Sequence, residues 1–157
     1  MVGKKKINFQ ITIGDVFAMP LGNGKYGYGQ IVGGGQPKTY VIYDITADKH
    51  PDVNDIVSKK IIFFTHTVDV QIEDGLWHLI GKIEVPENIR FPEYIVDTPN
   101  GYFVTNFEGE LLRPANPSEK ELLKTRKSVS PSIIEDAIKA QYGIEEWYPY
   151  LENIKYN

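Results

Sequence analysis

Apolar and polar residues alternate along much of the first 113 residues, and this period of two is typical of strands with one covered face. Three such runs come early, at residues 11–21, 26–32 and 39–45. The string Gly22-Asn-Gly-Lys25 separates the first two runs. Because a glycine-containing turn of this kind between alternating runs is a strong hairpin signal, these two strands should pair antiparallel.

The strand signals that follow differ in strength. Residues 60–68 begin with apolar side chains on both faces, which predicts a central strand covered from both sides. Four further strands are expected at residues 77–85, 94–96, 102–105 and 110–112. These runs predict about seven or eight strands in a curved antiparallel sheet or a partly open barrel, an arrangement similar to small SH3-like barrels.

Helical signals concentrate after residue 113. Asn116, followed by Pro117 and Glu119, has the pattern of a capping box and predicts a helix to about residue 127. A second helix should start at Ser130 and stop near Gly143. The side chains expected on its buried face are Ile134, Ala137 and Ile138. Those expected to face water are Glu135, Asp136 and Lys139.

These signals describe one α+β domain over residues 1–157. Residues 1–113 should be mainly strands, and residues 114–157 should hold two or three helices, with a last short piece starting near residue 145. One short helix is also expected at residues 51–57, with Pro51 at its first position.

Composition excludes several kinds of chemistry. The 157 residues include no cysteine, so disulfides, a thiolate nucleophile, cysteine-bound zinc and iron–sulfur clusters are excluded. The longest apolar runs fall short of the roughly 20 residues that a bilayer crossing needs. The basic start at residues 1–6 leads into an alternating stretch rather than a signal-peptide core, so we expect a cytoplasmic protein that does not bind membranes.

Motifs for cofactors and catalysis are weak. Gly22-Asn-Gly-Lys-Tyr-Gly27 matches the dinucleotide string, but strand periodicity follows it where a nucleotide site needs a helix. His66 and His78 lie in expected strands and could in principle face each other to bind a metal together with Asp69 or Glu84, but half-buried histidines hydrogen-bonded to the backbone are the expected arrangement. With no Gly-x-Ser-x-Gly string either, we predict no catalytic residue, no metal site and no cofactor, and therefore no enzyme.

Charge is distributed unevenly. Residues 69–110 hold nine acids and two bases, a net charge of −7 against −4 for the whole chain. This excess could serve solubility, or it could form a negative surface that attracts a basic partner. The residues expected to contact such a partner are the acids Glu73, Asp74 and Glu87 and the aromatic anchors Trp77 and Tyr102.

Two strings resemble a known family. Gly14-Asp-Val-Phe-Ala-Met-Pro-Leu21 and Gly24-Lys-Tyr-Gly-Tyr-Gly-Gln-Ile-Val32 are similar to the start of the Immunity protein 26 family of bacterial polymorphic toxin systems, and weaker similarity continues to about residue 113. The resemblance implies a small, non-catalytic protein that binds a cognate toxin domain and neutralises it. The strings are mostly glycine and apolar, so we expect them to define the fold rather than the binding site.

The toxin would have a basic face if it attacks nucleic acid, and the immunity protein itself should then bind no nucleic acid directly. The alternative that the residues leave open is a small ligand- or nucleic-acid-binding β-module with another cellular role.

Overall fold

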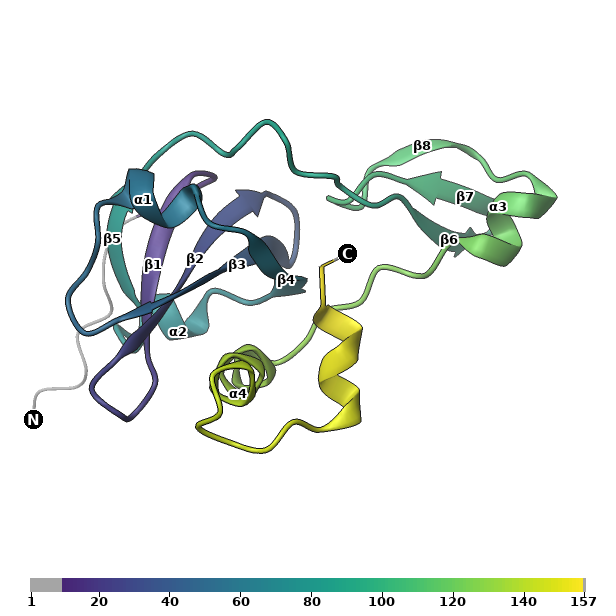
Figure 1. Cartoon of the computed structure of the whole chain (residues 1–157). Coiled ribbons are helices and arrows are strands. Elements are labelled where there is room, and N and C mark those ends of the chain that lie inside the picture. Colours follow the sequence, from purple (N-terminus) through teal and green to yellow (C-terminus); the bar gives the residue numbers. More distant parts are fainter. Residues whose placement is uncertain (1–9, 157) are drawn as a thin grey trace, which may run out of the picture.

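The computed structural model describes residues 10–156, and its largest element is a five-stranded antiparallel sheet (Figure 1). The spatial order of the strands is β4-β3-β2-β1-β5. Their bounds are β1 Asp15–Pro20, β2 Tyr26–Gly33, β3 Lys38–Ala47, β4 Ile61–Thr67 and β5 His78–Lys82. Because β4 and β5 lie at opposite edges, the sheet is open, and the barrel alternative does not apply. The basic start at residues 1–6 lies outside the described residues.

The three short strands expected after residue 93 form a sheet of their own rather than extending the first one. They are β6 Tyr94–Thr98, β7 Gly101–Thr105 and β8 Leu111–Pro114, in that order. With α3 (Pro117–Leu122) they make an arm that projects from the five-stranded sheet (Figure 1). The connection at residues 83–93 contains two prolines and leads the chain away from the edge strand β5.

Strand β4 is an edge strand, so the expectation of a central position was wrong, whereas the expectation of two covered faces was right. Phe63 belongs to one hydrophobic core and Phe64 to the other. The outer edge of β4 is covered by chain segments from far along the sequence. The Val129 amide donates to His66 O at 2.8 Å, and the Tyr156 amide donates to Ile62 O at 3.0 Å. These contacts satisfy backbone groups that an edge strand would otherwise present to solvent.

Glycine permits the tight packing and turning of β1 and β2. The hairpin forms as predicted, with Gly22 and Gly24 at φ +84° and +83°, and no helix follows. In β2, a Cβ on Gly29 would lie 2.5 Å from Phe17 Cζ, and one on Gly27 would lie 3.1 Å from Ile138 Cγ2. The glycine-rich string therefore lets side chains from β1 and α4 (Pro131–Gln141) approach the β2 backbone, which is a structural role.

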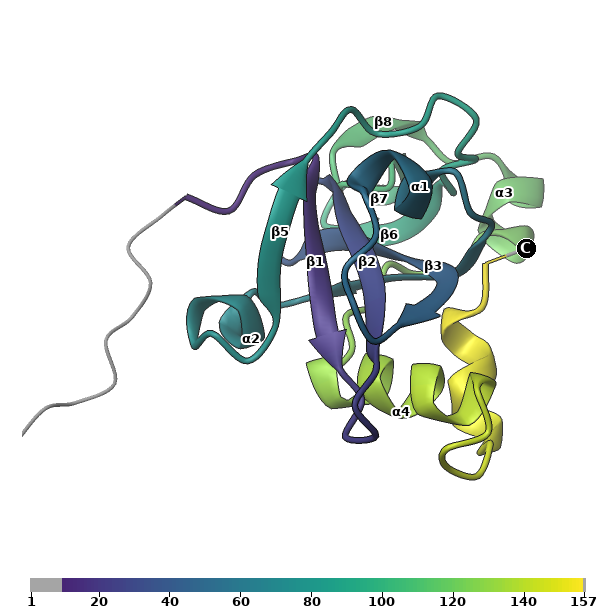
Figure 2. The same ribbon diagram turned by 60° about the vertical axis from the view of Figure 1, so that its left-hand side comes forward.

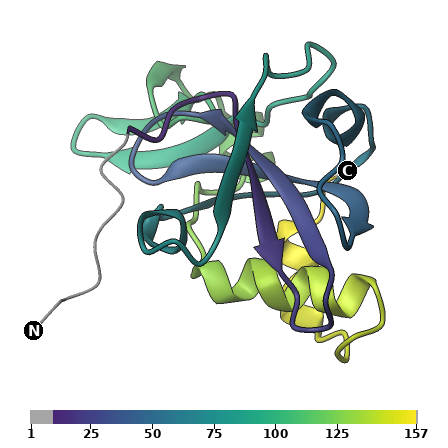
Figure 3. The ribbon, with the colours of Figure 1, turned by 90° about the vertical axis from the view of Figure 1, so that its left-hand side faces the viewer.

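Helices α1 (Val53–Val57) and α4 cover opposite faces of the five-stranded sheet (Figure 2). Helix α4 starts after Ser130, whose hydroxyl accepts the Ser132 amide, and it crosses below the sheet (Figure 3). Its buried residues are Ile134, Ala137 and Ile138, as predicted. Glu135 was expected to face water, but its carboxylate accepts hydrogen bonds from the side chains of Gln71 and Trp77.

The boundaries of the other helices differ from the predictions in detail. Asp52 caps α1, so Pro51 precedes the helix instead of beginning it. The capping box of Asn116 and Glu119 is present in α3, but the helix ends at Leu122, five residues early. The last piece is a 3₁₀ helix, η1, at Pro149–Ile154.

Candidate partner-binding surface

Trp77, expected to be a surface anchor, is a core residue. Only 1% of it is exposed, and its ring stacks on Phe17 with centroids 5.2 Å apart. Its indole Nε1 donates to Glu135 Oε1 at 2.8 Å. A partner cannot contact this ring in the folded protein, so the anchor assignment of Trp77 was wrong. The reason is that burying the large indole ring in the core that faces α4 removes much apolar surface from water.

The other expected contact residues do not form one site. Glu73 ends helix α2 (Val70–Glu73), Asp74 follows it, and both are exposed just before β5 begins. Glu87 follows the opposite end of β5. Tyr102 lies on β7 in the arm, with the Lys120 ammonium 4.2 Å from its ring centroid. Only Glu73 and Asp74 are therefore neighbours.

Part of the negative charge at residues 69–110 is used inside the molecule. Asp69 forms an ion pair with Lys38, and Glu93 forms one with Arg113 at 3.0 Å. Both cations come from outside the acidic segment. Since such pairing lowers the net field of the segment, the acids with exposed, unpaired positions matter most for steering a partner.

Helix α2 is held in place by side-chain contacts of Asp69 and Gln71. The Asp69 carboxylate, just before the helix, accepts a hydrogen bond from the Tyr40 hydroxyl as well as the Lys38 contact. Burial and the adjacent Asp69 raise the pKa of Tyr40 well above its ordinary value, so the phenol stays protonated and donates. On the other side, the Gln71 amide donates to Glu135 Oε1 of α4 at 3.2 Å. These contacts hold the short helix between β3 and α4.

The outer face of α2 combines acidic and apolar groups. Val70, Glu73 and Asp74 have the i, i+3 and i+4 spacing that places them on one helix face, opposite the buried Ile72. We call the exposed residues Val68, Val70, Glu73, Asp74 and Leu76 the α2 surface. The three apolar members are 51%, 41% and 46% exposed, respectively. Contiguous exposed apolar patches are typical of surfaces that bind other proteins.

A groove of about 310 Å³ runs beside the α2 surface. Its walls come from the β2–β3 loop, the end of β4 and α2, and its lining residues are Gln36, Pro37, Lys38, Thr67, Val68, Asp69 and Glu73. Because Lys38 and Asp69 are already paired, Glu73 is the one acid of the lining that has no ion-pair partner among the described residues.

The histidines do not form a metal site. His66 is 1% exposed, and its ring is hydrogen-bonded to the hydroxyls of Thr39 and Tyr94, both at 3.0 Å. Burial, reinforced by the Arg126 guanidinium, lowers the pKa of His66 to about 4, so the ring is neutral near pH 7. His78 lies on β5 at the far edge of the sheet, so it cannot meet His66. Within residues 10–156 no three acidic or histidine side chains gather as metal ligands.

Sequence reasoning missed the apolar part of the α2 surface. The signal in the sequence was the placement of Val68 and Val70 on either side of Asp69, directly after an expected strand. The structure shows that both valines are exposed. The pairing of Asp69 with Lys38 had no sequence signal, because the two residues are 31 positions apart.

A small α+β protein with a fixed apolar and acidic surface has the features of a protein that binds another protein. The family model described as Immunity protein 26 matches residues 12–105, more than half of the chain, so the chain belongs to the Immunity protein 26 family. Its members are immunity proteins of toxin systems. No curated protein and no solved structure matches the chain. Among residues 10–156, no helix has the length and apolar character required to span a bilayer.

Proposed function

We propose that this protein neutralises a cognate toxin domain by stoichiometric, non-catalytic binding in the cytoplasm, and that the α2 surface contacts the toxin. The observation that carries the proposal is a short helix, held between β3 and α4 by contacts of Asp69 and Gln71, that exposes Val70, Glu73 and Asp74 on one face. A fixed surface loses little conformational entropy on binding, so more of the contact energy contributes to affinity.

The two kinds of group on this surface have separate tasks. Glu73 and Asp74 attract a basic face of the toxin and accelerate encounter. Salt weakens this attraction, because at 0.1 M exposed charges more than about 10 Å apart are largely screened from each other. Val68, Val70 and Leu76 lose their contact with water in the complex and slow dissociation. A toxin that attacks nucleic acid would present such a basic face at its active site, and covering it would stop the reaction.

The test is binding kinetics between the full-length protein and the C-terminal toxin domain encoded by the adjacent gene. The double reversal Glu73→Lys/Asp74→Lys should lower the association rate about tenfold at low ionic strength and less at high salt. Glu84→Lys/Glu87→Lys is the matched control, since it also reverses two exposed acids, which follow the other end of β5. Its association rate should stay within twofold of wild type.

Two results would contradict the proposal in different ways. If the wild-type protein neither binds the neighbouring toxin domain nor protects cells that express it, the immunity function is wrong. If binding is tight but the Glu73/Asp74 reversal and the Glu84/Glu87 control behave alike, the α2 surface is not the contact face.

A further inference from the structure

A second exposed surface lies after α4. The rings of Tyr148 and Tyr150 stack with centroids 6.0 Å apart and an interplanar angle of 8°, yet they are 48% and 46% exposed. Ile144 is also exposed, and Glu146 lies between it and Tyr148 in the chain. We call Ile144, Glu146, Tyr148 and Tyr150 the C-terminal aromatic surface. Because both rings are exposed, they contribute little to the hydrophobic core. Tyrosine is enriched among the residues that dominate the binding energy of protein interfaces.

The base beneath these rings is firmly packed. Trp147 stacks on Phe63 of β4 at 6.2 Å, and its indole Nε1 donates to Glu152 at 3.0 Å. Leu151 and Ile154 of η1 are buried in the core that α4 covers. The tyrosines are thus presented on a fixed segment with few rotamers to lose, as is typical of preorganised anchors.

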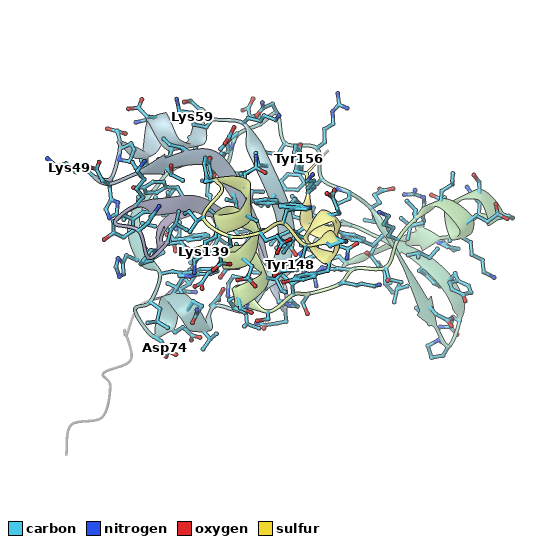
Figure 4. All side chains as sticks on the ribbon, turned by 60° about the horizontal axis from the view of Figure 1, so that its bottom comes forward. Lys49, Lys59, Asp74, Lys139, Tyr148 and Tyr156 are labelled. Atoms are coloured by element: carbon cyan, nitrogen blue, oxygen red, sulfur yellow. The ribbon has the colours of Figure 1, made fainter. Side chains whose placement is uncertain are left out.

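The surface can be reached by the same partner as the α2 surface. Helix α4 lies between them, with Glu135 near its start contacting Gln71 and Ile144 following its end. Its 11 residues span about 16 Å at 1.5 Å each. In Figure 4, Asp74 and Tyr148 lie on either side of α4 in one view of the molecule. A partner of ordinary interface size, burying about 800 Å² on each side, covers such a distance.

The chemistry of the surface favours a cation with a planar face. Tyrosine rings attract cations over their faces, and arginine both stacks on a ring and pairs with a carboxylate. Glu146 is exposed and has no ion-pair partner among the described residues, whereas Glu145 pairs with Lys139 and Glu152 with Lys155. The molecule already uses this chemistry next to the site, where the Lys155 ammonium lies 4.7 Å from the Trp147 ring centroid.

We propose that Tyr148 and Tyr150, together with Glu146, bind arginine side chains on the basic face of the toxin domain and slow the dissociation of the complex. This proposal rests on the proposed immunity function and divides the labour across one interface. The acids of the α2 surface control association, and the stacked tyrosines at the other end of α4 add to its aliphatic side chains in slowing release.

The experiment measures both rate constants for the full-length protein and the neighbouring toxin domain. Tyr148→Ala/Tyr150→Ala should raise the dissociation rate at least tenfold and change the association rate less than threefold. Tyr148→Phe/Tyr150→Phe keeps both ring faces and should stay near wild type. Tyr102→Ala is the matched control, an exposed tyrosine on the arm that should leave both rates unchanged. Glu146→Arg, which alters an exposed side chain, gives a second measure if the double alanine variant melts early.

The outcomes separate the two proposals. If the alanine pair and Glu146→Arg both leave dissociation unchanged while the α2 reversal slows association, the aromatic anchor is wrong and the immunity function stands. If the wild type does not bind the toxin domain, both fail. If sedimentation shows a dimer of this protein alone that the alanine pair disrupts, a second copy occupies the surface, and the arginine proposal is overturned.

Discussion

Acidification should destabilise this protein through His66, at the junction between the two sheets. The ring is 1% exposed and bonded to Thr39 of β3 and Tyr94 of β6, and its pKa falls from 6.5 to about 4 on folding. A depressed histidine pKa means that the unfolded chain binds the proton more readily. The stability that the neutral His66 ring contributes is therefore fully present above pH 6.5 and is lost as the pH falls toward 4.

The size of the effect follows from the difference of about 2.5 units between the two pKa values. At about 1.4 kcal/mol per unit, the loss of unfolding free energy attributable to His66 approaches about 3 kcal/mol at pH 4. Urea unfolding at pH 7, 6, 5 and 4 measures it, with His66→Gln as the comparison because glutamine keeps a polar group that does not titrate. The wild type should lose about 3 kcal/mol more than the variant. Parallel pH dependences in the two proteins would refute the reasoning.

Three further predictions concern stability and can be checked by denaturant or thermal unfolding. Gly29→Ala should lower the free energy of unfolding by about 3 kcal/mol, because the new methyl would lie 2.6 Å from the Val41 carbonyl oxygen. Gly24→Ala meets no atom within 4 Å, so it should cost only about 1 kcal/mol for its φ of +83°. Equal costs in the two variants would show that crowding is not the cause. Glu135→Ala should cost about 1–3 kcal/mol by leaving the Trp77 indole without its acceptor, a loss that a wild-type melting curve would disprove. Ile138→Asp should prevent stable folding, since it places an unpaired carboxylate in the core; an unchanged melting temperature would contradict the packing of α4.

Features that depend on a few adjacent residues were predictable from the sequence. The capping box at Asn116 and the glycine turn at Gly24 involve groups within about four positions, so the local string contains all the information. The start of α4 after Ser130 and its buried face follow in the same way from one cap and a helical period.

Features that depend on distant residues were not predictable. An apolar stretch such as residues 60–68 looks the same whether a strand or a separate chain segment covers its edge, so the edge position of β4 had no local signal. The burial of Trp77 depends on Phe17 and Glu135, which are 60 and 58 positions away. For the same reason, only the acidic residues of the candidate site could be predicted from the sequence. Glu73 and Asp74 stood out as charges, but which other residues share their face is decided by the fold.

The covered edge of β4 has a consequence for synthesis on the ribosome. The β4 backbone pairs with segments near residues 129 and 156, so its hydrogen bonds to them form only after these segments have emerged from the ribosome. Until then the nascent sheet exposes an unpaired strand that could pair with neighbouring chains. A chain interrupted before residue 128 would keep that whole edge open and tend to aggregate. The segments near residues 129 and 156 thus complete the sheet that β1 and β2 begin.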